Sequence, residues 1–209
     1  MTKKLFTCCL LALSAFFAPL AAAATQAPDE LVRKVTNEVL TIVRSDKAIQ
    51  AGDFQKTLAL VDEKVLPHFD FRRMTSLAVG PGWRSANPEQ QERLIAAFRI
   101  LLVRTYSNAL TKFRDQTIEF KPMRDNSGDK RVRVSTEVHQ SGAQPIPIDY
   151  ALEQTGQDWK VFDVIVNGAS LVTNYRGEFA GEVNAKGIEG LIASLEAKNK
   201  SLEAGQGGK

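Results

Sequence analysis

Residue types that commonly carry out catalysis are scarce in this 209-residue chain. Its two cysteines, Cys8 and Cys9, lie in an apolar N-terminal stretch, and its two histidines, His68 and His139, are far apart. A hydrolase needs a nucleophile beside a base, or a metal with its ligands, and the sequence indicates neither. It also lacks the motifs of a phosphate-binding loop, a nucleophile elbow and a zinc protease. We therefore expect no enzyme, no metal and no cofactor.

Asp163 is the one acid whose surroundings suggest catalysis. It lies in residues 159–166, which are largely apolar, and a carboxyl in an apolar pocket can serve a proton-transferring isomerase. The alternative, which we favour, is that Asp163 faces solvent or pairs with an arginine. His139 lies on the polar side of an alternating segment, and we interpret it as a solvated side chain.

The N-terminus has the three parts of a secretory signal peptide. Lys3 and Lys4 form the positive region, residues 5–20 are predominantly apolar, and alanines at 21–24 provide a cleavage site. We expect residues 1–24 to be removed and the protein to be exported, most simply to a bacterial periplasm. Removal takes away both cysteines and lowers the net charge from +3 to +1. So weak a charge argues against a nucleic-acid partner.

The first half of the mature chain is typical of helices. Asp53, Asp70 and Asn87 each precede a segment of helical periodicity, as N-cap residues do, and Gln90 completes a capping box with Asn87. After Asn87, apolar side chains cover more than half of the helix circumference as far as Phe113. We expect this segment to form one long central helix of about 26 residues.

The second half changes to a period of two. Apolar and polar residues alternate over 131–139 and over 146–152, and residues 159–166 and 117–120 supply two further strands. The sheet is expected to end within residues 167–170, a helical segment begins at Leu171, and a frayed polar tail begins at Asn199. The sequence therefore predicts one α+β domain over residues 25–209, a twisted antiparallel sheet wrapped by helices with extra helices at both ends.

The use of the apolar residues has two interpretations. The long helix and the strands could form an ordinary close-packed core. The same pattern would line an internal apolar cavity for a ligand, because a cavity is lined by the residue types that build a core. Composition alone does not separate these alternatives.

Short motifs along the mature chain favour the cavity. In order they are HFDFRRM at 68–74, GPGWR at 80–84, QQ at 90–91, Phe98, LVRTY at 102–106, IDY at 148–150, WKVFDV at 159–164, GASLV at 168–172, NYR at 174–176, Phe179 and GIEGL at 187–191. This ordered set resembles the MlaC, or toluene-tolerance auxiliary, family. Asn167 departs from the family, whose members often carry an acid there, so no role is carried over to that position.

The resemblance implies a periplasmic phospholipid carrier that maintains the lipid asymmetry of the outer membrane. It implies a sheet-and-helix cone similar to that of nuclear transport factor 2, with the two acyl chains of a glycerophospholipid in an internal apolar cavity. The implied partners are a lipoprotein–porin complex at the outer membrane and an inner-membrane ABC transporter with an MCE-domain ring. No catalytic residue is implied.

We expect the lipid to lie between a helical wall and a sheet wall. The predicted wall residues are Phe98, Leu101, Leu102, Tyr106 and Leu110 on the helix, and Val134, Val138, Ile148, Tyr150, Val164 and Val166 on the sheet. Two alternatives stay open. One is an isomerase-like enzyme on the same cone with a buried acid, and the other is an interaction module or chaperone with an exposed apolar groove.

Overall fold

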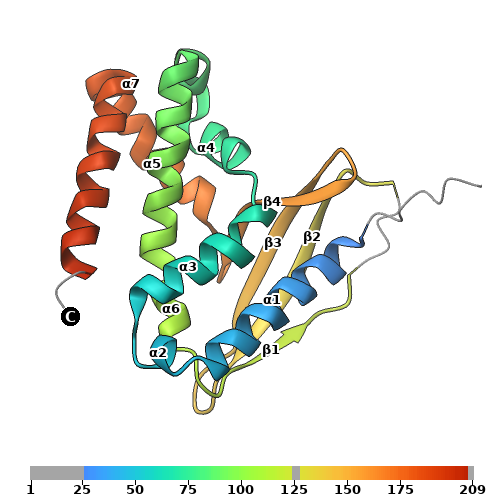
Figure 1. Cartoon of the computed structure of the whole chain (residues 1–209). Coiled ribbons are helices and arrows are strands. Elements are labelled where there is room, and N and C mark those ends of the chain that lie inside the picture. The colour runs from blue at the N-terminus through green and yellow to red at the C-terminus, as the bar shows by residue number, and fades with distance from the viewer. Residues whose placement is uncertain (1–25, 124–127, 207–209) are drawn as a thin grey trace, which may run out of the picture.

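The structure, a computed structural model, describes residues 26–123 and 128–206, which form seven α-helices, two 3-10 helices (Leu66–His68 and Gly80–Arg84) and five strands. The predicted signal peptide at 1–24 lies outside these residues. The helices are α1 (Pro28–Ser45), α2 (Lys47–Gln50), α3 (Phe54–Lys64), α4 (Phe71–Val79), α5 (Pro88–Tyr106), α6 (Asn108–Thr111) and α7 (Leu171–Gln206). The strands are β1 (Thr117–Phe120), β2 (Arg131–His139), β3 (Ile146–Thr155), β4 (Asp158–Val166) and β5 (Ala169–Ser170). The predicted α+β class is confirmed (Figure 1).

Side-chain caps fix the starts of three helices where the sequence predicts them. The carboxylate of Asp53 accepts a hydrogen bond from the backbone N–H of Lys56, and Asp70 does the same for Arg73. Asn87 forms the full capping box at α5. Each cap satisfies a backbone N–H that the first turn of a helix leaves without a partner.

The long helix predicted as far as Phe113 is shorter than expected. α5 ends at Tyr106, and the short helix α6 follows after Ser107. Ser107 is buried, and both Ser107 and Asn108 are residue types that favour helix caps over helix interiors. The helical spacing of apolar residues therefore continues across the break between α5 and α6, and so it does not reveal where α5 ends.

The sheet is antiparallel throughout, with the strands in sequence order from β1 to β5. A bulge between Ala151 and Leu152 shifts the register of β3 against β4. The sheet ends within residues 167–170 as predicted, but these residues also supply a short fifth strand that was not predicted, because Asn167 and Gly168 form a tight turn into β5. Their φ angles of 51° and 79° give the left-handed conformation that two-residue hairpin turns require.

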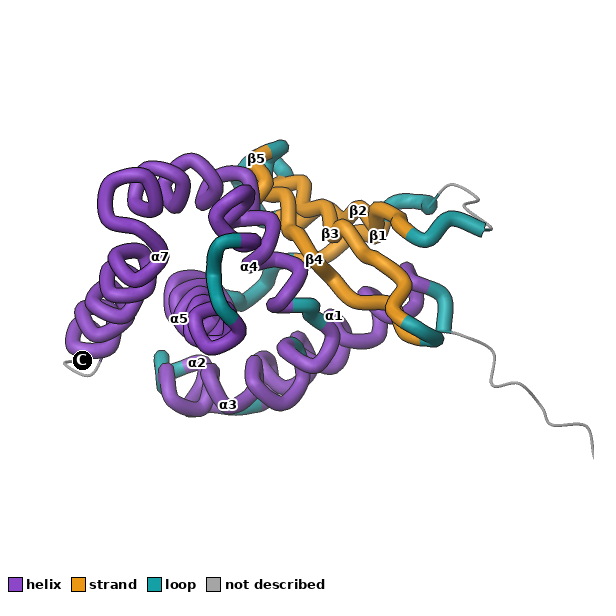
Figure 2. The backbone as a smooth tube through the Cα atoms, turned by 90° about the horizontal axis from the view of Figure 1, so that it is seen from above, coloured by secondary structure: helices purple, strands orange, loops and turns teal. Residues whose placement is uncertain are grey.

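Two main layers hold the fold together, as Figure 2 shows from above. α1 lies across one face of the sheet, and its Leu31 and Val32 pack on Val134, Leu152 and other strand residues. α4, α5 and α7 form a separate helical core beside β4 and β5. We call the sheet face under α1 the inner face.

α7 is the longest helix and contains a sharp break. Gly187, with φ 69° and ψ −174°, separates two halves that fold back on each other, so that Ser194 Oγ donates to Glu182 at 2.7 Å. The predicted frayed tail from Asn199 is wrong, because the helix continues to Gln206. Asn199 is buried and donates from Nδ2 to the carbonyl oxygen of Ala97 at 2.8 Å.

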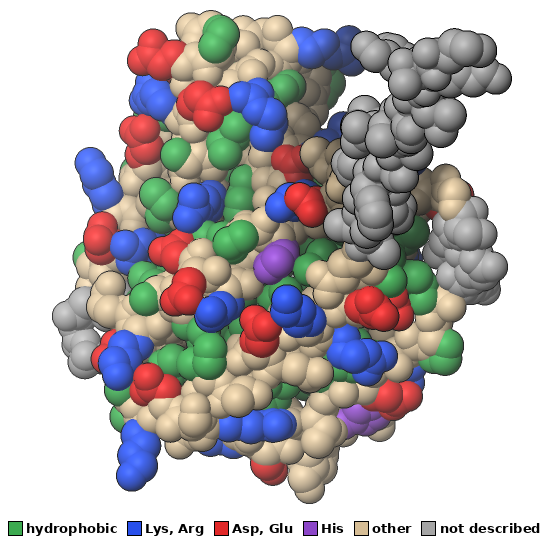
Figure 3. Space-filling view, turned by 45° about the vertical axis from the view of Figure 1, so that its right-hand side comes forward, with side chains coloured by type: hydrophobic (Ala, Val, Ile, Leu, Met, Phe, Trp, Pro, Cys, Tyr) green, Lys and Arg blue, Asp and Glu red, His purple; other side chains and the backbone are tan. Residues whose placement is uncertain are grey.

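Charged side chains of both signs are interspersed on the face of the molecule that Figure 3 shows. Ion pairs also join different elements, for example Arg93 on α5 with Glu189 and Glu196 on α7. Within residues 26–123 and 128–206, no helix is both long enough and apolar enough to cross a bilayer.

Candidate functional site

The inner face of β3 changes from fully buried to exposed along its length. Leu152 is completely buried under α1, whereas Tyr150 and Ile148 are only partly buried. Ile146, at the start of the strand, is 39% exposed. These four side chains alternate along one strand and therefore share one face of the sheet. The apolar surface of this face thus opens to solvent at one end.

Neighbouring strands widen this opening. In the register of the sheet, Ile146 lies opposite Val138 on β2, and Ile148 lies opposite Val166 on β4. We call these four residues, Val138, Ile146, Ile148 and Val166, the open strip. Within the described part of the chain, none of the four belongs to the three clusters of buried side chains or to the hydrophobic residues packed against them. Val164, opposite Tyr150, leads from the open strip into the packed region beneath α1.

Polar groups on the inner face are few and satisfy one another. Thr136 Oγ1 donates to the carbonyl oxygen of Ile148 at 3.1 Å. Burial raises the pKa of the Tyr150 hydroxyl, and a hydrogen bond with Thr136 opposes that shift. Tyr150 therefore stays neutral at ordinary pH, and this wall of the site carries no charge.

The structure places the predicted helical wall away from the open strip. Phe98, Leu101 and Leu102 are buried in the helical core, where the Phe98 ring meets those of Tyr175 and Phe179 edge-on, with centroids 5.1 and 5.2 Å away. Other members of the predicted wall lie elsewhere. Tyr106 is 44% exposed at the end of α5, Leu110 packs against the cluster formed by α1, α2 and α3, and Val134 is buried beneath α1.

The five remaining predicted residues come together. They are Val138, Ile148, Tyr150, Val164 and Val166, all of them partly buried on the inner face. The prediction omits Ile146, although it follows the same alternation and its proline neighbours mark it as the exposed start of a strand.

Asp163, the candidate catalytic acid, has a structural role. Its carboxylate accepts hydrogen bonds from Ser170 Oγ at 2.5 Å and from the backbone N–H of Val172 at 3.1 Å. Val172 lies in the first turn of α7, where backbone N–H groups lack partners within the helix. Asp163 thus acts as a cap for α7 and faces away from the open strip, since its neighbour Val164 lies on the inner face.

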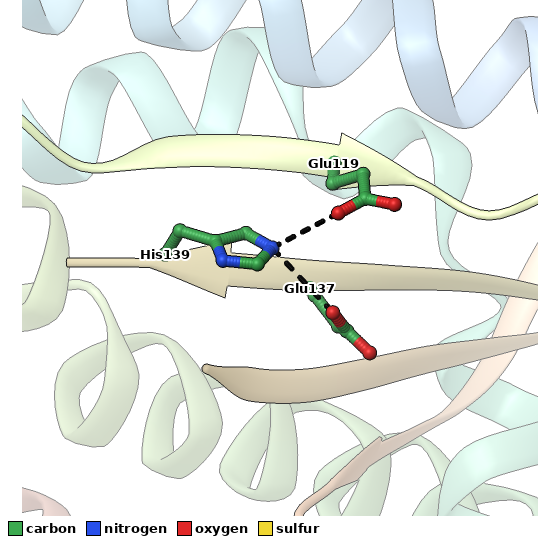
Figure 4. Close-up of side chains that lie close together, drawn as sticks. All are labelled: Glu119, Glu137 and His139. Atoms are coloured by element: carbon green, nitrogen blue, oxygen red, sulfur yellow. Dashed lines mark hydrogen bonds and ion pairs between the residues drawn. The ribbon is translucent and has the colours of Figure 1, made fainter. Parts of the chain in front are cut away.

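Glu119, Glu137 and His139 form the one group of potential metal ligands found among the described residues (Figure 4). His139 Nε2 lies 3.1 Å from a carboxylate oxygen of Glu119 and 3.4 Å from one of Glu137. Lys121 Nζ lies 2.8 Å from each of the same two carboxylates, and its hydrogen bond is the main cause that lowers the pKa of Glu119. Since the Lys121 ammonium already pairs with both carboxylates, we assign this group as an ion-pair network.

Two hollows lie away from the open strip. A groove of about 340 Å³ between α3 and α5 is lined by Leu58, Asp62, Ala96, Arg99, Ile100, Val103 and Arg104. A second hollow, of about 240 Å³, includes His68, whose pKa is lowered by burial and by nearby Lys160. Neither hollow contains a residue of the open strip.

Comparison with known proteins assigns this arrangement to a family. The model of the MlaC protein family matches residues 33–197, most of the chain. This chain belongs to the MlaC family. It is 31% identical over 179 residues to the toluene tolerance protein ttg2D of Pseudomonas putida, covering 85% of this chain and 82% of that protein.

Two other relatives connect the MlaC family to phospholipid. The chain is 23% identical over 197 residues to the intermembrane phospholipid transport system binding protein MlaC of Haemophilus influenzae, covering 93% and 92% of the two chains. It is also similar to a phospholipid-binding protein from Ralstonia solanacearum, solved in complex with a phospholipid. That similarity has a TM-score of 0.79 and 35% identity, and covers 84% of this chain and 98% of the other. The predicted family is therefore confirmed.

Proposed function

We propose that residues 25–209 form a single lipid-binding domain that carries a glycerophospholipid, with its two acyl chains against the inner face of the sheet. The observation that carries the proposal is the open strip, an apolar surface outside the three buried clusters of the described residues, in a chain of the same fold as a phospholipid-bound relative. The lining we propose consists of Val138, Ile146, Ile148, Tyr150, Val164 and Val166.

Burial of acyl chains gives such a carrier its energetic basis. Each buried CH2 group contributes about 0.8 kcal/mol, so a chain of about 16 carbons gains on the order of 12 kcal/mol relative to water. Lipid held at an apolar site is therefore not released into water. It passes at little net cost to another apolar environment, such as a bilayer or a second binding protein.

Location and partners complete the proposal. We infer that residues 1–24 direct export to the periplasm, where the protein moves phospholipid between the two membranes and so helps to maintain outer-membrane asymmetry. The proposed exchange partners are an outer-membrane lipoprotein–porin complex and an inner-membrane ABC transporter with an MCE-domain ring. The name of the Haemophilus relative, an intermembrane phospholipid transport system binding protein, supports this role.

A non-catalytic role agrees with the inner face. Its polar groups, Thr136 and Tyr150, bond to one another and to the backbone, and the acid proposed for an isomerase, Asp163, caps α7. We therefore prefer the carrier to the isomerase-like alternative.

Mass spectrometry of the mature protein, purified without added lipid, tests the proposal. We expect stoichiometric two-chain phospholipid to co-purify and to appear under native conditions as one bound species. Protein that is empty, and stays empty after incubation with phospholipid vesicles, would contradict lipid binding.

A variant pair tests the site. Ile148→Glu places a charge in the proposed lining, and we expect it to lower bound lipid at least tenfold, because an unpaired charge is costly to bury. Ile100→Glu, at an isoleucine that is 43% exposed on α5, is the matched control and should load normally. Circular dichroism would establish that both variants are folded. Normal loading of folded Ile148→Glu would exclude this residue from the lining.

A further inference from the structure

Three segments that are distant in sequence lie at the end of the molecule where the open strip emerges. They are α2, the loop at 112–116, and the β2–β3 connection at 140–145 (bottom of Figure 1). Arg114 Nη2 donates to the carbonyl oxygen of Gln50 at 2.7 Å, which ties the loop to α2. Thr117, which directly follows the loop, pairs with His139 at the foot of the β2–β3 hairpin. We call this end of the molecule the hairpin end.

The tip of the hairpin end is uncharged and partly apolar. Residues 140–148, QSGAQPIPI, contain no ionisable side chain. Pro145 and Pro147 are exposed, and Ile146 is 39% exposed, one of three large hydrophobic residues with such exposure among those described. Ile146 also belongs to the open strip, so the exposed apolar tip is continuous with the proposed lipid site.

Basic residues lie at the same end of the molecule, at the end of α1, on α2 and in the α6–β1 loop. Segments 44–50 and 108–116 contain four cations, Arg44, Lys47, Lys112 and Arg114, and only two acids, Asp46 and Asp115. The guanidinium group of Arg44 donates to the carbonyl oxygen of Gln116, and that of Arg114 donates to the carbonyl oxygens of Gln50, Thr111 and Phe113. Because a backbone carbonyl is uncharged, these hydrogen bonds do not neutralise either arginine. Lys47 and Lys112 are exposed.

Asp46 does little to neutralise this group. Its carboxylate accepts hydrogen bonds from the backbone N–H groups of Ala48 and Ile49 and pairs with Lys56 at 3.4 Å. The nearby acids Glu119 and Glu137 pair with Lys121. The hairpin end therefore combines an exposed isoleucine between prolines with the four cations of segments 44–50 and 108–116. Anionic bilayers attract this combination, since cations interact with the headgroups while apolar side chains enter the interface.

We propose that the hairpin end docks on the surface of a bilayer that contains anionic phospholipid, with Ile146 inserted among the headgroups. This inference rests on the proposed carrier function and names the surface with which the site exchanges lipid. In the docked state the open strip faces the acyl region of the bilayer. A lipid chain then moves along Ile146 and Ile148 toward Val164 without crossing water.

Vesicle flotation of the full mature chain tests the docking. We expect binding to vesicles that contain phosphatidylglycerol, and weaker binding to vesicles of phosphatidylcholine alone. Lys47→Gln and Lys112→Gln should each lower binding to the anionic vesicles about fivefold, and this loss should shrink at high salt. Ile146→Asn should lower binding roughly tenfold.

Matched controls come from elsewhere on the surface. Ile100→Asn changes an equally exposed isoleucine on α5, and Lys200→Gln changes an exposed lysine near the end of α7. Both should bind like the unmodified protein. Absence of vesicle binding, or equal losses in the control variants, would overturn the docking. The docking would also be overturned if Ile146→Asn bound vesicles as well as the unmodified protein does. In that case the hairpin end would have a protein as its partner. Native mass spectrometry of the same preparations reports lipid loading separately, so failure to dock is distinguishable from failure to bind lipid.

Discussion

Asp163 illustrates, at the scale of single residues, why the same sequence pattern suggests both catalysis and structure. An acid in an apolar segment has the environment that raises the pKa of catalytic carboxyls. Its actual partners, Ser170 Oγ and the N–H of Val172, reach it only because the Asn167–Gly168 turn reverses the chain. That reversal depends on three-dimensional structure, and so the sequence favoured a solvent-facing or arginine-paired Asp163 and did not predict the cap.

Replacement of Asp163 tests the capping role. We expect Asp163→Ala to lower the free energy of unfolding by about 1–2 kcal/mol, because the first turn of α7 loses its hydrogen-bond acceptor. Lipid loading of the folded variant should be unchanged. Urea denaturation measures the stability, and Asp158→Ala at the exposed start of β4 is the control, with an expected change within about 0.5 kcal/mol. Equal stability of Asp163→Ala and the unmodified protein would argue against the cap.

Tyr175 gives a prediction about pH. Burial, followed by the neighbouring Tyr106, raises the pKa of Tyr175 to about 12. An unfolded tyrosine ionises near pH 10, so between about pH 10 and 12 the folded state holds a proton that the unfolded state has lost. Stability contributed by Tyr175 is therefore present below pH 10 and is lost as the pH rises toward 12.

The loss should stay below about 1.4 kcal/mol per pH unit. Urea denaturation at pH 9, 10 and 11 would measure it. Tyr175→Phe should fall less steeply over this interval than the unmodified protein, whatever its stability at pH 7. Parallel curves for the two proteins would show that Tyr175 does not titrate in this way.

At the scale of elements, local signals account for most of the fold. Caps at Asp53, Asp70 and Asn87 and the alternation of β2 and β3 gave the correct element types, because these signals depend on residues a few positions apart. The break at Ser107 was missed because hydrophobic periodicity continues across it. β5 was missed although Asn-Gly between apolar residues is a hairpin signal.

Side-chain placement was less predictable than element type. The apolar stripe of α5 was assigned to a lipid wall, whereas Phe98 and Leu102 pack against α4 and α7. A wide stripe shows that a helix is largely surrounded, but it does not show which neighbours surround it. The sheet residues were better placed, because alternation and pairing register bring Val138, Ile148 and Val166 to one face.

Gly187 offers a test at the level of one element. Its φ of 69° with ψ of −174° falls in a region that is almost restricted to glycine. We expect Gly187→Ala to destabilise the protein by about 1–3 kcal/mol, because the two halves of α7 can fold back only through this conformation. Gly181→Ala, within the first half of α7 and with open space around the added methyl group, should instead stabilise by up to about 1 kcal/mol. Thermal unfolding measures both, and the same sign for the two variants would contradict this account.

At the scale of the whole molecule, the residues that stabilise the fold lie apart from those proposed to bind lipid. The helical core and the packed end of the inner face contain the fully buried side chains, including Phe98, Phe179 and Leu152. The open strip lies at the opposite end of the inner face and is absent from the buried clusters of the described residues. A ligand can therefore enter or leave the open strip without unpacking the helical core.

This separation predicts how lipid leaves the protein. Because release into water costs on the order of 12 kcal/mol for each acyl chain, spontaneous dissociation into solution is too slow to support transfer. We expect the rate of transfer from loaded protein to acceptor vesicles to rise in proportion to vesicle concentration, since collision with an apolar acceptor provides the route. Fluorescent phospholipid, dequenched on transfer, measures this rate. If the rate is independent of vesicle concentration, lipid leaves through water, and a carrier that exchanges lipid by contact is excluded.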